Sequence, residues 1–533
     1  MAFRKQPLAL YIISLIIFLV VAILPVGFML AQFVVRLAVH PSSVTTVLID
    51  SRQLILLGRS LTIAVSATAV AFGLGLPVAI ILSAKDLPCR RLFYFLVLVP
   101  ILIPSYVMAG AWIHLLSPSG FINSILACLF GPSAKLTVFS VFGCTWCLGM
   151  SFFPIIAFIV AAGLSELDSS LNDIARLSTG RWGVFWHSSF PQMRPHLAAS
   201  ICLVMIFVLA QYGVPSLLGL NTYPVEIFAQ FSAFYDDTGA VAAAIPLIIL
   251  VIFLVLLQRW IMRNHTYFRI TPASETTNPI RLGKFRCGAI CLLIFLFIIT
   301  TVLPFLSVLA GAQSFAKIVS TLHSSCEGIL NTSILALSAA VISTVIAFPI
   351  GCHLVHNRSS FTRMLDIICW LPIAIPGTIM GLGIIKLTSS FLALQRNDSF
   401  GLLLLLAYMG MFSAFSIRIF EAAHRRADPN ITEAAVMDCP RWYQKFFYVD
   451  IPLHARAIAA SIIMVFVLVI GELNATVLLI PPGKATLAVS VDNLLHYGAN
   501  ATASALCLIE AGLVILAAVL GLIFWSIARR ILR

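Results

Sequence analysis

The feature that most constrains this chain is a series of about twelve apolar stretches, each long enough to cross a bilayer about 30 Å thick. The composition agrees, since 61% of the 533 residues are hydrophobic and only 10% are charged. The sequence therefore predicts an all-α integral membrane protein. Its membrane helices are expected at residues 8–31, 59–82, 92–116, 137–164, 196–220, 238–262, 287–311, 330–354, 365–394, 400–424, 456–480 and 501–527.

The basic residues predict the orientation, because Lys and Arg concentrate in loops that stay in the cytoplasm. With the N-terminus inside, most of the 33 Lys and Arg residues fall on the inner side, including the region 259–286 and the C-terminal Arg529, Arg530 and Arg533. Both termini are then cytoplasmic. The net charge of +13 is interpreted as a topology signal and a contact with anionic membrane lipid, and not as nucleic-acid binding.

One segment occurs twice. Residues 430–452 read NITEAAVMDCPRWYQKFFYVDIP, and a degraded copy, SLNDIARLSTGRWGVFWHSSFP, occupies residues 170–191. In each copy a hydroxyl or amide residue, Ser170 or Asn430, stands three positions before an acid, which is the spacing of a helix-capping box. Ten residues after the cap stands Gly180 or Pro440, and both residue types end helices. The pattern predicts two short, equivalent helices facing the cytoplasm.

A second repeat lies in the apolar stretches. The segment LVPILIPSYVMAG corresponds to WLPIAIPGTIMGLG. With Pro77 and Pro349, which lie before these segments, three prolines keep their spacing in both copies. Proline removes a backbone donor and kinks a membrane helix. We therefore expect a bent or broken helix in each copy, with the kinks at Pro100 and Pro104 and at Pro372 and Pro376.

The repeats divide the chain into two halves, each of five spans preceded by one extra span, which makes six spans per half. The first half is 56–262 and follows an initial helix and outer loop at 1–55. Residues 263–325 form a cytoplasmic linker, a seventh helix and an outer loop, and the second half is 326–527. Six spans per half return the chain to the same side, so the two halves are expected to be parallel and related by an axis along the membrane normal.

The sequence carries no enzyme signature. It has neither the GxxxxGK[ST] loop of an ATP-hydrolysing protein nor an HExxH motif, so we predict a protein that is not an enzyme and binds no cofactor. Cys144 and Cys147 form one CxxC without a second pair, which favours packing over a metal or redox site. The histidines His114, His353 and His356 are dispersed, and no metal site is predicted.

Polar residues inside apolar stretches normally mark a transport path. Glu472, in VIGELNATVLL, is the clearest case, and Asn474 stands beside it. Gln211 and Tyr212 occupy the corresponding level of the first half. These four residues are the candidate translocation path, with a structural hydrogen bond to a neighbouring helix as the alternative for Glu472.

Three further charged residues receive a structural interpretation. Glu510 lies in the last stretch, where a hydrogen bond between helices is expected. Asp366 and Lys386 lie near the ends of their stretch, where they are expected to reach the membrane interface.

The repeated motifs resemble a known family. EAA at 433–435, followed by VDIP ending at Pro452, resembles the cytoplasmic loop of permease subunits of ABC importers. A single chain with two such halves is similar to the ferric-iron permeases of binding-protein-dependent uptake systems, of type I fold, and to the related thiamine and aminoalkylphosphonate permeases. The segment GELNATVLLIPPGKATLAV is especially similar to the iron-type members.

The resemblance implies that each short helix couples the permease to an ATPase subunit. The motif is carried by Asp173, Ile174, Ala175 and Arg176 in the first copy and by Glu433, Ala434, Ala435 and Val436 in the second. Ile174 replaces the middle alanine of the motif, and Thr179 and Cys439 replace its glycine. The implied partners are two copies of a cytoplasmic ATPase and an extracytoplasmic solute-binding protein, with the permease in the bacterial inner membrane.

The transported solute stays open at this point. Ferric iron is favoured over thiamine, with phosphonate and polyamine as further alternatives. Two other classes remain: an ion-coupled secondary transporter, which can also have twelve spans in two parallel halves, and a membrane scaffold without transport. Copurification of an ATPase would argue against both.

Overall fold

The computed structural model of the chain describes residues 8–39, 51–133, 135–165, 167, 183, 185–263, 282–357, 359–391, 401–439, 441–481, 483–498 and 501–531. These residues form helices joined by loops, and no strand occurs among them. They include 10 helices long and apolar enough to cross a membrane, or up to 12 if each of two bent helix pairs is one span. The prediction of an all-α, multi-pass membrane protein is confirmed.

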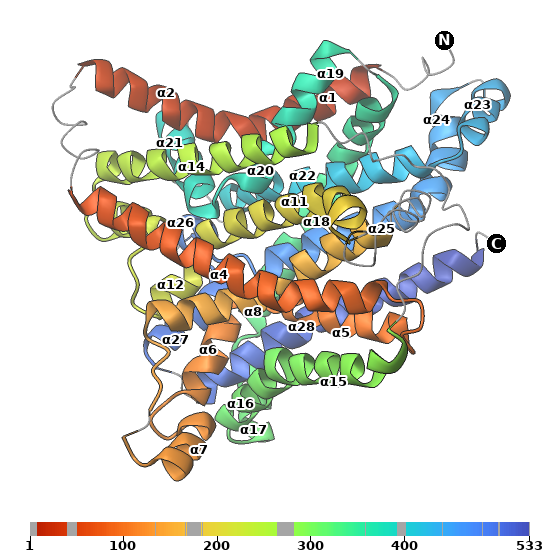
Figure 1. Ribbon diagram of the computed structural model, residues 1–533. Coiled ribbons are helices and arrows are strands. Elements are labelled where there is room, and N and C mark those ends of the chain that lie inside the picture. The colour runs from red at the N-terminus through yellow and green to blue at the C-terminus, as the bar shows by residue number, and fades with distance from the viewer. Residues whose placement is uncertain are drawn as a thin grey trace.

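Each half contributes a matching series of helices (Figure 1). The first half consists of α4 (Ser51–Ser83), α5 (Arg90–Leu102), α6 (Ser105–Leu115), α7 (Phe121–Phe130), α8 (Val141–Ser165), η2 (Phe185–Ser189), α11 (Phe190–Leu209), α12 (Gly213–Leu217), α13 (Tyr223–Ser232) and α14 (Asp237–Arg263). The second consists of α18 (Cys326–His356), α19 (Ser360–Ile368), α20 (Leu371–Ala374), α21 (Gly377–Phe391), α22 (Leu402–Arg426), α23 (Pro429–Asp438), α24 (Trp442–Lys445), η6 (Phe446–Asp450), α25 (Ile451–Ile470), α26 (Thr476–Leu479), α27 (Leu487–His496) and α28 (Ala501–Ile531). The domain limits stated above stay a prediction.

Both proline-rich segments break a helix, as the sequence predicts. α5 and α6 meet at an angle of 88°, and the helix pair 360–374 and 377–390 meets at 104°. The cause is local, because a residue before proline is driven out of the helical region of backbone space. Ile103 and Ile375, which precede Pro104 and Pro376, are both extended, with ψ of 127° and 119°.

Two predicted spans end earlier than expected. Residues 196–220 and 456–480 are not continuous helices, because α11 ends at Leu209 and α25 at Ile470. In each half a short loop follows, then a one-turn helix, α12 or α26, and then α13 or α27. The apolar composition of these segments hides the breaks, since buried loops and buried helices share the same hydropathy.

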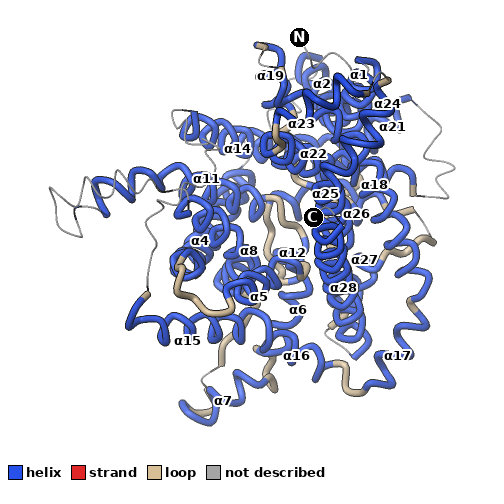
Figure 2. Tube along the Cα trace, turned by 90° about the vertical axis from the view of Figure 1, so that its right-hand side faces the viewer, coloured by secondary structure: helices blue, strands red, loops and turns tan. Residues whose placement is uncertain are grey.

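The extra span at the start of each half packs against the other half. The first comprises α1 (Leu8–Phe18), a π-helical turn η1 (Leu19–Ile23) and α2 (Leu24–Val39), and it contacts α18, α21 and α22. The second comprises η3 (Gly283–Phe285), α15 (Arg286–Phe297), a second π-helical turn η4 (Ile298–Val302) and α16 (Leu303–Gly311), and it contacts α5 and α6. It is followed by α17 (Phe315–Ser324). Figure 2 shows α2 beside α21 and α22 at the top, and α15 below α4 and α5.

The contacts of these swapped spans are specific. The ring of Tyr11 stacks on that of His353 with a centroid separation of 3.8 Å, and Gln32 Nε2 donates to Ser390 Oγ at 3.1 Å. In the other direction, Ser307 Oγ donates to the carbonyl oxygen of Ala111 at 3.0 Å. Each half therefore packs against the leading span of the other half.

The start of the second series of helices, at Leu282 and Gly283, is held against the first half by hydrogen bonds. Asp86, in the turn between α4 and α5, accepts hydrogen bonds from the backbone N–H groups of Leu282 at 3.0 Å and Gly283 at 2.9 Å. These bonds, the one from Leu282 foremost, hold the pKa of the Asp86 carboxyl below its usual range. The second series of helices therefore begins from a defined point on the first half.

The first long helix of each half carries a stripe of small residues that lets it approach its neighbours closely. Without a hydrophobic force between helices in lipid, such stripes allow backbones to pack tightly. The stripe is fully buried or nearly so, and its corresponding positions are Ala64, Ala67, Ala71 and Gly75 on α4 and Ala336, Ala339, Ser343 and Ala347 on α18.

Replacing Gly75 with Leu is expected to prevent α4 from packing against α8. A Cβ atom at Gly75 would lie 2.8 Å from the carbonyl oxygen of Phe153 and 2.9 Å from Ile156 Cβ, so the helices must separate. Overpacking of this kind typically costs about 1–3 kcal/mol. The yield and thermal midpoint of detergent-extracted protein should fall. Gly73→Leu is the matched control, because Gly73 is exposed and a Cβ there meets nothing within 4 Å; equal losses in both variants would contradict the prediction.

Candidate functional site: a central cavity and the α23 segment

A cavity of about 350 Å³ lies between the two halves and is lined by matching elements of both. The helix breaks contribute residues 101–106 together with Pro372, Ile373, Ile375 and Gly377. α8 and α22 contribute residues such as Phe152 and Phe412, and α11 and α25 contribute residues such as Phe207 and Leu468. The loops that follow α11 and α25 also line the cavity. Among the described residues that line it, 14 belong to the first half and 14 to the second.

Glu472 lies in the wall of this cavity with 4% of its surface exposed. Its carboxylate accepts hydrogen bonds from the backbone N–H of Ala475 at 2.7 Å and from the backbone N–H and side-chain amide of Asn474 at 3.1 and 3.3 Å. A Cβ at Gly377, the first residue of α21, would lie 2.5 Å from Glu472 Oε1. Glycine at this position therefore leaves room for the carboxylate against the start of α21.

The first half presents a neutral version of the same arrangement. Gln211 corresponds to Glu472, and its Oε1 accepts a hydrogen bond from Ser105 Oγ at 2.9 Å, where Ser105 corresponds to Gly377. The two loops also touch each other, because Asn474 Oδ1 accepts from the backbone N–H of Tyr212 at 2.9 Å. The two halves thus meet at this end of the cavity through an asparagine whose amide also holds Glu472.

The structure brings together three of the four residues proposed for the path. Gln211, Glu472 and Asn474 line the cavity. Tyr212 does not line it; the residue is buried, with its ring 5.0 Å from that of Phe228. A role of these residues in transport stays a prediction, and for Tyr212 the geometry supports a packing role.

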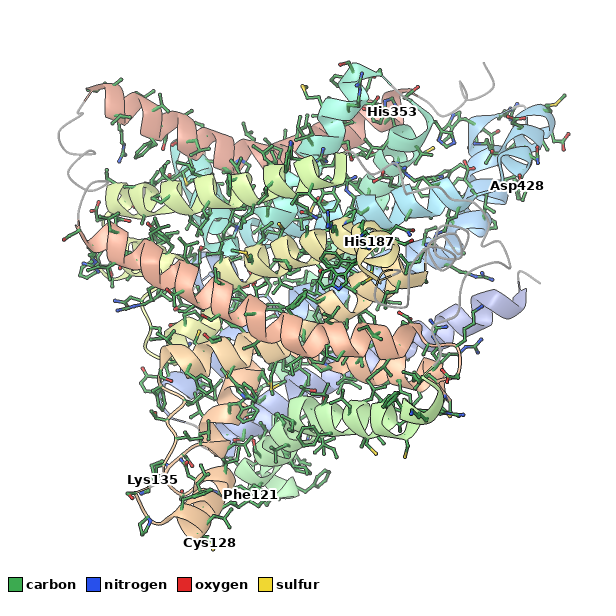
Figure 3. The ribbon with its side chains drawn as sticks, in the orientation of Figure 1. Phe121, Cys128, Lys135, His187, His353 and Asp428 are labelled. Atoms are coloured by element: carbon green, nitrogen blue, oxygen red, sulfur yellow. The ribbon has the colours of Figure 1, made fainter. Side chains whose placement is uncertain are left out.

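The short helix α23 was expected to be capped by Asn430, and this assignment is wrong. Asp428 is the N-cap, its side chain accepts the backbone N–H of Asn430 at 2.9 Å, and Pro429 occupies the first helical position. Proline suits that position because its missing N–H would be unpaired there anyway. The helix ends at Asp438, before Pro440, as predicted, and Figure 3 labels Asp428 at its start, where α23 projects from the body of the protein.

On α23 the motif residues divide into two faces. Glu433 and Ala434 are exposed, whereas Ala435 is 6% exposed and faces the protein. The side chain of Val436 is outside the described part of the structure, and so is the whole first copy of the motif, Asp173, Ile174, Ala175 and Arg176. Glu433, the acid of the motif, therefore lies on the exposed face of α23.

The segment that follows α23 is anchored in the core. Asp450 is buried and forms an ion pair with Lys445 at 3.3 Å, and its carbonyl oxygen lies 2.9 Å from His454 Nδ1. Phe348 of α18 contacts the rings of Phe446 and His454 at centroid distances of 5.5 and 5.7 Å. The segment between α23 and α25 thus packs on the core, and the far end of α25 leads directly into the loop that carries Glu472.

Ion pairs that the sequence did not predict join α14 of the first half to the broken helix of the second. Lys386 bonds Asp237 at the start of α14 and is 7% exposed, and its reach to the membrane interface stays a prediction. At the other end of α14, Arg259 bonds Asp366 at 3.0 Å, and Arg418 bonds the same carboxylate at 2.5 Å. Asp366 is thus an interhelical link between the halves.

The contact between α6 of the first half and α28 of the second is held by hydrogen bonds instead. The hydroxyl of Tyr106 on α6 donates to Glu510 on α28, which is fully buried, and His114 Nε2 lies 3.1 Å from Ser504 Oγ. The predicted interhelical hydrogen bond of Glu510 is confirmed. No sequence signal identifies these partners, because they are hundreds of residues apart in the chain.

Comparison with known proteins agrees with this architecture. Residues 71–265 match the family described as binding-protein-dependent transport system inner membrane component. The match covers most of the first half, which is therefore similar to inner-membrane permeases of this class.

The similar proteins extend the comparison to most of the chain. The Fe(3+)-transport system permease protein FbpB 2 of Haemophilus influenzae is 22% identical over 453 residues, which cover 82% of this chain and 83% of that protein. The ferric transport system permease protein FbpB of Actinobacillus pleuropneumoniae is 20% identical over 407 residues, 72% of this chain and 58% of that protein. A protein of Salmonella paratyphi A whose name suggests 2-aminoethylphosphonate transport, PhnV, is 30% identical over 155 residues, 29% of this chain and 57% of that protein.

Proposed function

We propose that this chain forms the translocation path of an ATP-driven importer for ferric iron. The observation that carries the proposal is the similarity to a ferric permease over 82% of the chain, a length that includes both halves. The shared cavity supports it, because a solute passing between two repeats must cross the space that both of them line.

The partners follow from the class of permease and from α23. A binding protein would deliver the solute on one side, and two copies of an ATPase subunit would dock on the other, one at α23 and one at the first copy of the motif. Glu433 and its neighbours are proposed as the docking residues of the second half. The start of α1, the end of α28 and α23 lie toward the same side in Figure 1, which agrees with cytoplasmic termini and a membrane-lipid contact for the basic residues of that side.

The coupling path is α25. This helix of 20 residues spans about 30 Å. Its first turn is fixed to η6 and α18, and its last residue precedes the loop of Glu472 and Asn474. A shift of α23 driven by the ATPase would therefore be transmitted along α25 to the cavity wall, and the helix breaks at Pro104 and Pro376 are the proposed points of flexing.

The experiment is uptake of labelled Fe(III), thiamine and 2-aminoethylphosphonate by cells that express the chain with its own ATPase and binding protein. A parallel strain carries an ATPase that cannot hydrolyse ATP. Accumulation of iron only with the active ATPase is the expected result. Uptake that does not need the ATPase would support the secondary-transport alternative, and ATP-dependent uptake of another solute would replace iron as the cargo.

A further inference from the structure

The described residues of the cavity wall carry charge of one sign only, which is negative. Among the described residues that line the cavity, Glu472 is the only carboxylate, and no Lys, Arg or His is present. The other polar contributions are neutral groups such as Gln211, Asn474, Ser105 and Ser151. The residues of the ion pairs between the halves, at Asp366 and Lys386, do not belong to this lining.

Glu472 has hydrogen-bond donors but, among the described residues, no ion-pair partner. Its carboxylate is held by three N–H groups of its own loop and lies against the first residue of α21. Amide donors and a helix start stabilise a negative charge, yet burial beside apolar residues opposes it. A carboxylate has about four acceptor positions, so a further ligand can be accommodated.

The surroundings of Glu472 favour a ligand of positive charge. Electrostatic interactions are stronger beside low-dielectric walls than in water, and this wall consists mainly of Ile, Leu, Phe, Met and Pro side chains. A cation in the cavity is attracted to Glu472, and an anion such as a phosphonate is repelled by it. The oxygen atoms of Gln211, Asn474 and the serines suit a hard cation as well.

We propose that Glu472 is a transit site for a cationic cargo, and that it makes the cavity select cations over anions. The inference rests on the proposed transport function of the cavity. Asn474 acts as a positioning residue, because its side-chain amide bonds the carboxylate while its carbonyl oxygen bonds the first half at Tyr212.

The test first removes the negative charge at position 472 and then restores it at position 211. In cells expressing the complete importer, Glu472→Gln should lower ATP-dependent uptake of labelled Fe(III) about tenfold or more, with normal amounts of permease in the membrane. The double variant Glu472→Gln with Gln211→Glu places the charge at the equivalent point of the first half. It should recover most of the uptake if the cavity needs a negative charge.

The control and the contrary outcomes are specific. Glu510→Gln neutralises another buried acid that does not line the cavity, and it should retain uptake. Unchanged uptake in Glu472→Gln, absence of recovery in the double variant, or an equal loss in Glu510→Gln would overturn the inference. Failure of the proposed function is distinguished from this, because it is seen in the unmodified importer as uptake that is independent of the ATPase or is absent for iron.

Discussion

Uptake driven by ATP is expected to fall to background in Glu433→Lys, while the permease still inserts in the membrane. Glu433 is exposed on α23, on a helix held by the cap at Asp428 and followed by an anchored segment. Reversing its charge would place a cation where the ATPase is proposed to meet an acid, and losses at such contacts reach about 2–5 kcal/mol. The measurements are labelled-solute uptake and the amount of ATPase that copurifies with the permease.

The matched control for this variant is Glu327→Lys. Glu327 is an exposed acid at the start of α18, the opposite end of that helix from the α23 side, so the change in net charge is the same. Copurification of the ATPase should be unaffected in the control. Full uptake and full ATPase binding in Glu433→Lys would contradict the coupling role of α23.

Replacing Asp366 with Ala is expected to destabilise the contact between the halves. The carboxylate bonds Arg259 of the first half and Arg418 of the second, and Arg418 is 16% exposed with its guanidinium 4.6 Å from the ring centre of Trp370. Removing the acid leaves two guanidinium groups without their common partner. Because both arginines retain some contact with solvent, we expect a loss of about 2–3 kcal/mol rather than the larger cost of a fully buried pair.

A double-mutant cycle separates this inter-half coupling from general loss of charge. Arg259→Gln and Asp366→Asn, alone and together, should show a coupling energy of about 1–2 kcal/mol in the unfolding of the detergent-solubilised permease. Glu421 supplies the control, since it pairs with Arg418 and Arg425 of its own helix and with neither end of α14. Additive effects of Arg259→Gln and Asp366→Asn would show that the ion pair does not join the halves energetically.

The parts of this fold that depend on local composition could be predicted from the sequence. Apolar length defined the spans, and proline chemistry defined the two helix breaks, because both effects act within a few residues. The N-cap of α23 could also have been predicted from the sequence. Pro429 directly after Asp428 is a stronger start signal than the spacing of Asn430 and Glu433, which led to the wrong residue.

The parts that depend on distant contacts could not be predicted in this way. The partner of Lys386 is 149 residues away, and the partner of Tyr106 is 404 residues away. Hydropathy also could not separate α11 and α25 from the loops that follow them, since those loops are buried between the halves. The candidate path was partly found because Glu472 is costly in an apolar segment, whereas the neutral residues beside it gave a weaker signal.

The exchange of the leading spans has a consequence for biosynthesis. α1 and α2 leave the ribosome first, but the helices that they contact, α18, α21 and α22, follow roughly 300 residues later. At about 5–20 residues per second the delay is on the order of 15–60 s. During this interval the first span must wait in the bilayer beside lipid or an insertion factor. A ribosome that stops after α14 therefore releases a first half that lacks the α15–α16 span and whose own leading span lacks its main partners.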